Sequence, residues 1–86
     1  MSAPDPAAKA AYDALADEYE VISKNVVEGW RSRDAQDRAR TNLSYARRLF
    51  RIAALQAPAE GETHEGFERS LEAIRKHLAS ARREIT

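Results

Sequence analysis

Apolar residues recur every three or four positions along almost the whole of this 86-residue chain, a spacing that is typical of amphipathic helices. The first stripe comprises Tyr12, Leu15, Ala16, Tyr19, Ile22, Val26 and Trp30. The second comprises Ala35, Ala39, Leu43, Ala46, Leu49, Phe50, Ala53 and Ala57, and the third Phe67, Leu71, Ile74, Leu78, Ala81 and Ile85. No segment shows the alternation of a strand, and no Asn-Gly or Asp-Gly pair marks a hairpin. The sequence therefore predicts an all-α fold.

Capping residues and prolines set the ends of three predicted helices, at about residues 6–31, 34–57 and 64–85. Asp5 and Pro6 begin the first, because the aspartate accepts an unpaired backbone N–H and proline has none to satisfy. Pro58 ends the second helix. Thr63 is the predicted cap of the third, after a loop that holds two of the three glycines.

The region around Gly29 leaves two arrangements open. A glycine inside a helix costs only about 1 kcal/mol, so the first two segments can join into one rod of roughly 75 Å that needs a partner chain. Alternatively, Ser32 or Asp34 caps a separate second helix. We favour the break, which gives a single domain over residues 1–86, built as a long helical hairpin plus a third helix in a three-helix bundle.

The third predicted helix carries a seam suited to knobs-into-holes packing, because its apolar residues alternate steps of four and three. A chain of this length lies near the lower limit for a self-sufficient core, and association of copies supplies further burial. We therefore expect a homo-oligomer. Its candidate interface residues are Trp30, Phe67, Leu71, Ile74, Leu78 and Ile85. Trp30 lies on the core stripe of the first helix, which is its simplest explanation, but tryptophan is enriched in binding hot spots and can instead anchor an interface.

Several common chemistries lack their residues in this sequence. There is no cysteine, so disulfides, zinc–thiolate sites and thiol nucleophiles are excluded. His64 and His77 are the only histidines, and neither belongs to an evident catalytic triad. Acids that can supply metal ligands crowd around His64, but the inward Glu-x-x-His pairs of di-iron bundles are missing; these acids are Glu60, Glu62, Glu65 and Glu68. We expect no enzymatic activity, no metal and no cofactor.

Neither a membrane nor nucleic acid is an expected partner. No stretch approaches eighteen apolar residues, and the N-terminus MSAPDPAAKAA lacks the apolar core of a signal peptide, so we expect a cytoplasmic protein. With 14 basic and 14 acidic residues the chain has no net charge, and electrostatic attraction to nucleic acid is correspondingly weak.

The charge is nevertheless unevenly distributed. Residues 1–30 carry six acids and two lysines, net −4, whereas residues 31–51 carry seven arginines and two aspartates, net +5. Within the second region, the segment RTNLSYARRLFR places arginines three, four and seven positions apart, so that they share one side of a helix. The candidate ligand- or partner-binding residues are Arg40, Ser44, Tyr45, Arg47, Arg48 and Arg51.

Two interpretations of these arginines are open. Guanidinium groups flanked by hydroxyls and an aromatic ring can clamp a phosphate and stack a base or sugar. Alternatively, an antiparallel hairpin places the acids of the first helix alongside the arginines and leaves little free charge. Those acids are Asp13, Asp17, Glu20 and Glu28.

The C-terminal half, LSYARRLFRIAALQAPAEGETHEGFERSLEAIRKHLASARREI, runs helix, proline stop, acidic turn and a helix rich in small residues and leucine. In this order it resembles the helical-hairpin domain of phage proteins that sequester the cyclic-nucleotide signals of bacterial anti-phage defence. It departs from them in its ending, ASARREI, which lacks asparagine. The resemblance implies a phage or mobile-element origin, oligomerisation, and a phosphate site that includes Tyr45, Arg47 and Arg48.

These observations support two functional hypotheses. The first is a small non-enzymatic interaction module that self-associates through the seam of the third helix and binds a macromolecular partner, expected to be a protein. The second is a protein that binds or sequesters a phosphorylated small molecule or cyclic nucleotide through its basic middle helix.

Overall fold

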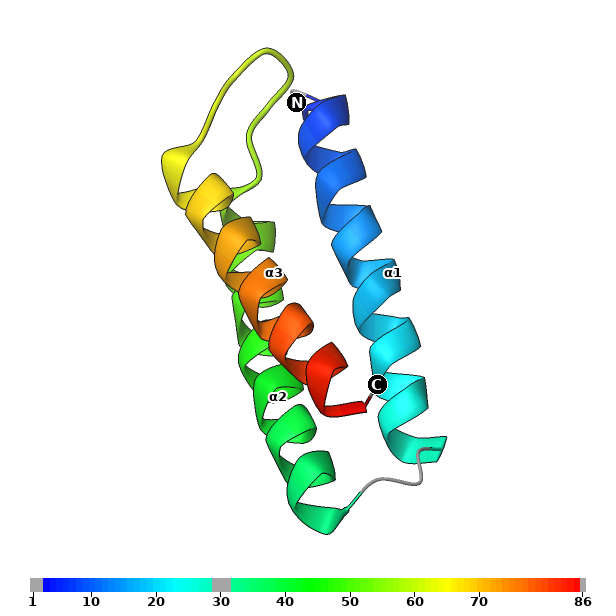
Figure 1. Ribbon diagram of the computed structural model, residues 1–86. Helices are drawn as coiled ribbons and strands as arrows, with labels where there is room; N and C mark the ends of the chain where they lie inside the picture. Colours follow the sequence, from blue (N-terminus) through cyan, green and yellow to red (C-terminus); the bar gives the residue numbers. More distant parts are fainter. Residues whose placement is uncertain (1–2, 29–31, 86) are drawn as a thin grey trace.

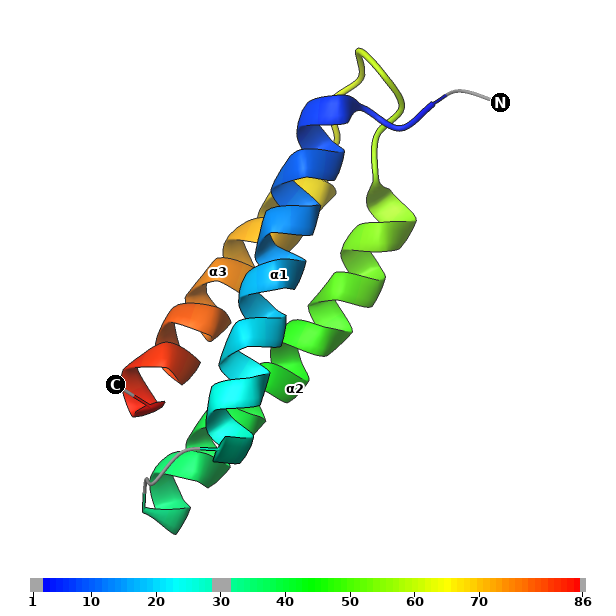
Figure 2. The ribbon, with the colours of Figure 1, turned by 90° about the vertical axis from the view of Figure 1, so that its right-hand side faces the viewer.

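The computed structural model describes residues 3–28 and 32–85 of the chain. These residues contain three helices, α1 (Pro6–Glu28), α2 (Arg33–Gln56) and α3 (Glu65–Ile85), and no strand. The helices run down, up and down in the views of Figures 1 and 2, in an elongated bundle whose Cα atoms extend over 47 Å along its axis. The predicted all-α three-helix bundle is confirmed.

The helix ends show which capping predictions hold. Asp5 caps α1, since its Oδ2 accepts the Ala8 N–H at 3.0 Å. Ser32, one of the two predicted candidates, caps α2 by accepting the Ala35 N–H at 3.2 Å. The prediction that Thr63 caps α3 is wrong, because His64 occupies the position before the helix and its Nδ1 accepts the Phe67 N–H at 3.1 Å.

Aromatic contacts between α1 and α2 exclude the continuous rod. The ring of Phe50 meets the rings of Tyr12 and Tyr19 edge to face, with centroids 5.4 and 5.7 Å apart. The Tyr12 hydroxyl also donates to the Phe50 carbonyl at 3.4 Å. Residues near the start of α1 therefore lie against the C-terminal half of α2, as in an antiparallel pair. Gly29 and Trp30, where the break was predicted, lie outside the described residues.

The core is formed by the predicted apolar faces of all three helices. Ala39, Ala46 and Ala53 recur at seven-residue intervals on α2 and are completely buried. Such small side chains allow two helix backbones to approach closely, and α2 and α3 share the most extensive contact of the three helix pairs. The largest fully buried side chains come from α1 and α3 and are Ile22, Val26, Phe67, Leu71, Ile74 and Leu78.

Ion pairs connect α3 to both neighbours. The Arg38 guanidinium donates from Nε and Nη2 to the two carboxylate oxygens of Glu84, each at 3.0 Å. Both the hydrogen bond and the charge of Arg38 lower the pKa of Glu84 below its ordinary value. Arg82 of α3 lies 3.1 Å from a carboxylate oxygen of Glu18 on α1. These bonds fix the end of the bundle where α3 terminates.

At the opposite end, the segment before α1 is tied to the loop between α2 and α3. The Asp5 N–H donates to the Pro58 carbonyl at 3.0 Å, and the Glu60 N–H donates to the Ala3 carbonyl at 2.9 Å. The Asp5 Oδ1 accepts the N–H of Gly61 at 3.3 Å. Gly61 has φ +80°, a conformation that glycine adopts without steric cost and that turns the loop back toward α3. Within the described part of the chain, no helix is long and apolar enough to span a membrane.

Candidate functional site

The four arginines of the segment 40–51 are exposed on α2. Arg47 and Arg51 are separated by one helical turn, and Arg40 lies two turns before Arg47 on the same side. Ser44 stands between them, one turn after Arg40 and one turn before Arg48. We call Arg40, Ser44, Arg47, Arg48 and Arg51 the arginine face.

None of these guanidinium groups forms an ion pair with a described side chain. Five ion pairs do form among the described residues, and they engage other partners. On α1, Asp13 pairs with Lys9 of its own helix and Glu18 pairs with Arg82 of α3. The acids of α1 whose side chains are described therefore do not neutralise these arginines, and that interpretation does not hold for them. The side chain of Glu28 lies outside the described residues. The arginine face keeps its positive charge.

The arginine face surrounds an open hollow on the surface of α2. This first hollow has a volume of about 290 Å³ and is lined by Ser44, Arg47, Arg48 and Arg51. Three guanidinium groups and a hydroxyl thus converge on one space. Guanidinium groups bind phosphate oxygens in a bidentate manner, and a serine hydroxyl can add a further donor.

A second hollow lies between α2 and α1 and adjoins the first. It has a volume of about 320 Å³, and Ser44 and Arg47 contribute to both hollows. Its remaining lining is Tyr19, Ser23 and Val26 from α1 and Arg40 and Leu43 from α2. The two hollows together form a groove that is strongly basic at one end and partly apolar, with an aromatic ring, at the other.

Tyr45 does not belong to this groove, although the sequence grouped it with the arginines. Its ring stacks on His77 of α3, with centroids 5.2 Å apart and planes 19° from parallel. His77 in turn has its Nδ1 3.0 Å from the Asn42 Oδ1. The Arg48 guanidinium lies 5.9 Å from the Tyr45 centroid, within the range of a cation–π contact. Tyr45 therefore faces α3 and lines neither hollow, although Arg48 contacts both its ring and the first hollow.

The groove also includes four residues that the sequence did not predict as site residues: Tyr19, Ser23, Val26 and Leu43. Tyr19 was assigned to the core stripe, and it is half-buried against Phe50, with part of its surface on the second hollow. Ser23 follows one turn later on the same side of α1. If the first two predicted helices are aligned side by side as an antiparallel hairpin, Tyr19 and Ser23 come to lie beside Leu43 and Arg47.

The predicted interface seam of α3 lies inside the single chain. Phe67, Leu71, Ile74 and Leu78 are each no more than 1% exposed, because α1 and α2 of the same molecule cover them. Ile85 is half-buried at the end of the helix. This corrects the prediction that the seam joins copies of the chain, since Phe67, Leu71, Ile74 and Leu78 have no free surface in the folded chain. Trp30, the other interface candidate, lies outside the described residues.

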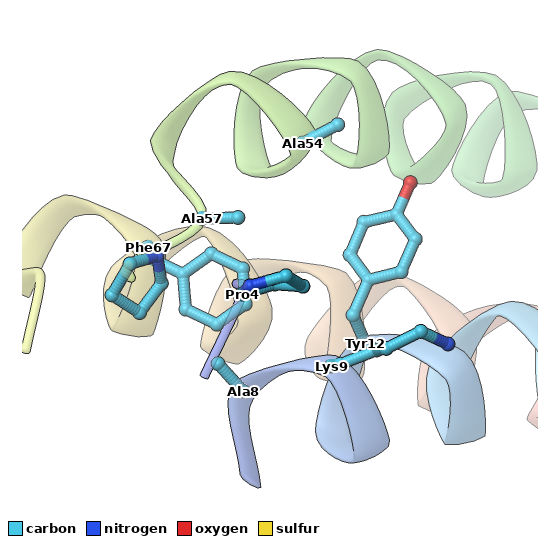
Figure 3. Close-up of a pocket in the computed structure, with 8 residues that line it drawn as sticks. Pro4, Ala8, Lys9, Tyr12, Ala54, Ala57 and Phe67 are labelled. Carbon is cyan, nitrogen blue, oxygen red and sulfur yellow. The ribbon is translucent and has the colours of Figure 1, made fainter. Parts of the chain in front are cut away.

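A third hollow, unlike the others, is almost entirely apolar. It lies where α1 begins and α2 ends, has a volume of about 230 Å³, and is drawn in Figure 3. The rings of Phe67 and Tyr12 flank it, Ala8 and Ala57 narrow it, and Lys9 extends along its rim. Its other lining residues are Pro4, Ala54 and Pro58.

The two histidines both make structural contacts. His64 caps α3, whereas His77 stacks on Tyr45 and contacts Asn42. Among residues 3–28 and 32–85, no group of three or more histidine, aspartate or glutamate side chains is arranged to hold a metal ion. The chemistry that the described side chains offer is concentrated in the groove.

Comparisons with protein families, with curated proteins and with solved structures find no match to this chain.

Proposed function

We propose that this protein is a non-enzymatic helical binding module that takes up a phosphorylated small molecule in the groove between α1 and α2. The observation that carries the proposal is the arginine face, whose four guanidinium groups have no ion-pair partner among the described residues and border two adjoining hollows. It supports the second of the two hypotheses drawn from the sequence. A macromolecular partner, the first hypothesis, stays a prediction.

The shape of the groove indicates a ligand with two different ends. Arg47, Arg48 and Arg51 converge on the first hollow, where a phosphate group can accept several charge-assisted hydrogen bonds. The second hollow offers Arg40 at one side and the ring of Tyr19 with Leu43 at the other. A ligand with phosphate oxygens and a flat or apolar portion complements both hollows. A cyclic nucleotide, which the resemblance of the C-terminal half implies, has this composition.

The arginines extend far enough for more than one phosphate group. Arg51 lies eleven positions after Arg40, which corresponds to about 16 Å along the helix axis. All of these side chains are exposed, so solvent ions screen their charges and the affinity should fall as salt is added. A single phosphate should therefore bind weakly, and a ligand with two or three phosphates should bind more tightly.

Nonspecific binding to nucleic acid is a less satisfactory use of the same surface. The chain has no net charge, so its overall field does not attract a polyanion, and the arginines are confined to one side of α2. Nucleic-acid affinity from a few phosphate contacts falls steeply with salt. A small ligand that enters the groove also contacts Tyr19 and Leu43, and the strength of these contacts does not depend on the salt concentration.

The proposal is tested by thermal shift and calorimetry with inorganic triphosphate, ATP, cyclic dinucleotides and a short DNA duplex, each at about 50 and about 200 mM salt. We expect stabilisation by at least one phosphorylated small molecule at both salt concentrations. Arg47→Ala should abolish it, because Arg47 lines both hollows. Arg69→Ala is the matched control, since Arg69 is an exposed arginine of α3 that pairs with Glu65.

Two results would refute the proposal. One is the absence of stabilisation by every phosphorylated ligand at low salt. The other is an equal loss of binding in the Arg47→Ala and Arg69→Ala variants, which would mean that only the general positive charge matters. Binding to the DNA duplex alone would favour the nucleic-acid function instead.

A further inference from the structure

Three of the four large apolar side chains that are exposed among the described residues belong to α2. They are Tyr45, Ile52 and Leu55, whose exposed fractions are 48, 46 and 90%, whereas the fourth, Val21, lies on α1. Ile52 follows Tyr45 by seven positions and Leu55 follows Ile52 by three, so all three project from one side of the helix. A single exposed leucine is ordinary on a protein surface, but neighbouring exposed apolar side chains mark an interaction surface.

This side of α2 has the residue spacing of a seam between packed helices. Steps of four, three, four and three connect five exposed residues, which we call the outer stripe: Thr41, Tyr45, Arg48, Ile52 and Leu55. The buried alanines of α2 project from its opposite side, so the core of the chain does not use the outer stripe. From its first to its last residue the stripe extends about 21 Å along the axis, which is long enough to contact about four turns of a second helix.

The arginine face borders the outer stripe along one edge and determines the charge of a complementary partner. Arg48 belongs to both, Ser44 and Arg51 come next to the stripe, and Arg47 follows further round the helix. None of these arginines forms an ion pair with a described side chain. Where two helices pack along a seam, the residues that flank it form the ion pairs that select the partner. A helix with acidic residues beside an apolar seam therefore complements this surface.

We propose that the outer stripe docks an acidic amphipathic helix of a partner protein. The apolar seam of that helix packs against Tyr45, Ile52 and Leu55. Its flanking carboxylates pair with Arg48 and Arg51, whose charges are otherwise not neutralised by the described side chains. This interaction goes beyond the proposed phosphate site, because it uses the apolar side chains that line neither hollow of the groove.

A second copy of the chain complements the outer stripe less well. If two copies of α2 lie antiparallel with Tyr45 of each against Leu55 of the other, the two Arg51 side chains come together. If they lie parallel and in register, the two Arg48 side chains meet in the seam. Like charges placed together oppose association, so the charge pattern favours a partner of opposite charge.

Contacts within the chain hold part of this surface in place before a partner binds. The Tyr45 ring stacks on His77 of α3 with centroids 5.2 Å apart, and the Arg48 guanidinium lies 5.9 Å from the Tyr45 centroid. Side chains that are already held lose less conformational entropy on binding. The Tyr45 and Arg48 side chains are thus arranged for a contact with a helix that carries both apolar and acidic groups.

Two synthetic peptides of about three heptads test the proposal with the full chain. Both carry leucine at alternating steps of four and three, but one has glutamate and the other lysine at the positions that flank this seam. In calorimetry at about 50 mM salt, the glutamate peptide should bind with a Kd on the order of 10–100 µM, and the lysine peptide should bind at least about tenfold more weakly.

Variants of the chain locate the contact on the outer stripe. Ile52→Ser and Leu55→Ser each remove one apolar side chain from the proposed contact and should weaken binding of the glutamate peptide by about tenfold. Val21→Ser is the matched control, because Val21 is 55% exposed on α1 and lies outside the stripe, and it should bind like the native chain. In nuclear magnetic resonance of the isotope-labelled native chain, the glutamate peptide should shift the amide signals of Tyr45, Ile52 and Leu55 and leave that of Val21 in place.

The proposal is overturned if the glutamate peptide does not bind at about 1 mM, if both peptides bind equally, or if Leu55→Ser binds the glutamate peptide as the native chain does. It is also overturned if the native chain alone forms a dimer in sedimentation equilibrium and Leu55→Ser dissociates it, because the stripe then joins two copies. The phosphate site is tested separately. Arg47→Ala should lose triphosphate binding and keep peptide binding, whereas Leu55→Ser should do the reverse.

Discussion

Truncation of two leucines tests whether the seam of α3 stabilises the single chain or joins copies of it. Leu78 is completely buried in the seam, whereas Leu55 is 90% exposed on α2. Replacing each by alanine removes the same atoms from opposite environments. The difference between the two variants therefore isolates the effect of burial within one chain.

The expected change in the free energy of unfolding follows from the burial of each side chain. Removing a fully buried leucine costs about 2–5 kcal/mol, from lost transfer free energy and the cavity that remains. Removing an exposed one changes the free energy of unfolding by less than about 0.5 kcal/mol. A chain of 86 residues has a total stability of about 4–13 kcal/mol, so Leu78→Ala should remove a large part of it.

Urea denaturation followed by circular dichroism measures both variants, at protein concentrations about a hundredfold apart. We expect the loss in Leu78→Ala to be independent of concentration, because all of its contacts are intramolecular. A loss below about 1 kcal/mol, or one that grows as the protein is diluted, would refute the assignment of this seam to the core of one chain.

Three further predictions concern the ends of the bundle. Asp5→Ala removes the cap of α1 and the bond to the Gly61 N–H, and it should lower the free energy of unfolding by about 1 kcal/mol in urea denaturation; an unchanged value would contradict the capping. Gly61→Ala should cost about 1 kcal/mol although nothing lies within 4 Å of the added Cβ, because φ is +80°; a neutral effect would contradict that conformation. Arg38 lowers the pKa of Glu84, so this ion pair stabilises the fold above the ordinary glutamate pKa and stops doing so as the pH falls through the lowered value. Native chain and Glu84→Gln should therefore differ in thermal stability near pH 7 and converge as the pH falls below the lowered pKa of Glu84, and a difference that persists in acid would contradict the pairing.

Most of the fold could be predicted from the sequence because it depends on local features. The spacing of apolar residues within each helix determines which side is buried, and Asp5 and Pro58 mark helix ends through short-range chemistry. The cap of α3 is also a local feature, but the prediction chose the wrong residue for it. The sequence favours a threonine cap, whereas the structure uses the ring of the next residue, His64.

The site could be predicted only in part. The arginines are visible as a local concentration of charge on one side of a helix, and the structure places them together. Their surroundings depend on how α2 is rotated between its two neighbours, which no single helix encodes. As a result Tyr45, adjacent to the arginines in sequence, faces α3, while Tyr19, from another helix, completes the groove.

The same dependence on rotation explains the seam. A spacing of alternating four and three residues indicates that a helix packs against another helix, but it does not distinguish a helix of the same chain from one of a second copy. Here α1 and α2 cover Phe67 and Leu78 completely. The seam is therefore part of the core of the single chain.

The arginine face can be tested most directly by nuclear magnetic resonance of the arginine side-chain Nε–H groups during titration with inorganic triphosphate and ATP. We predict that both ligands shift the signals of Arg47, Arg48 and Arg51, and that ATP additionally shifts the ring signals of Tyr19. The signals of Arg69 and Arg75, which are paired on α3, should remain in place. Equal shifts at all of these arginines, or shifts only at the α3 pair, would contradict a phosphate site in the groove between α1 and α2.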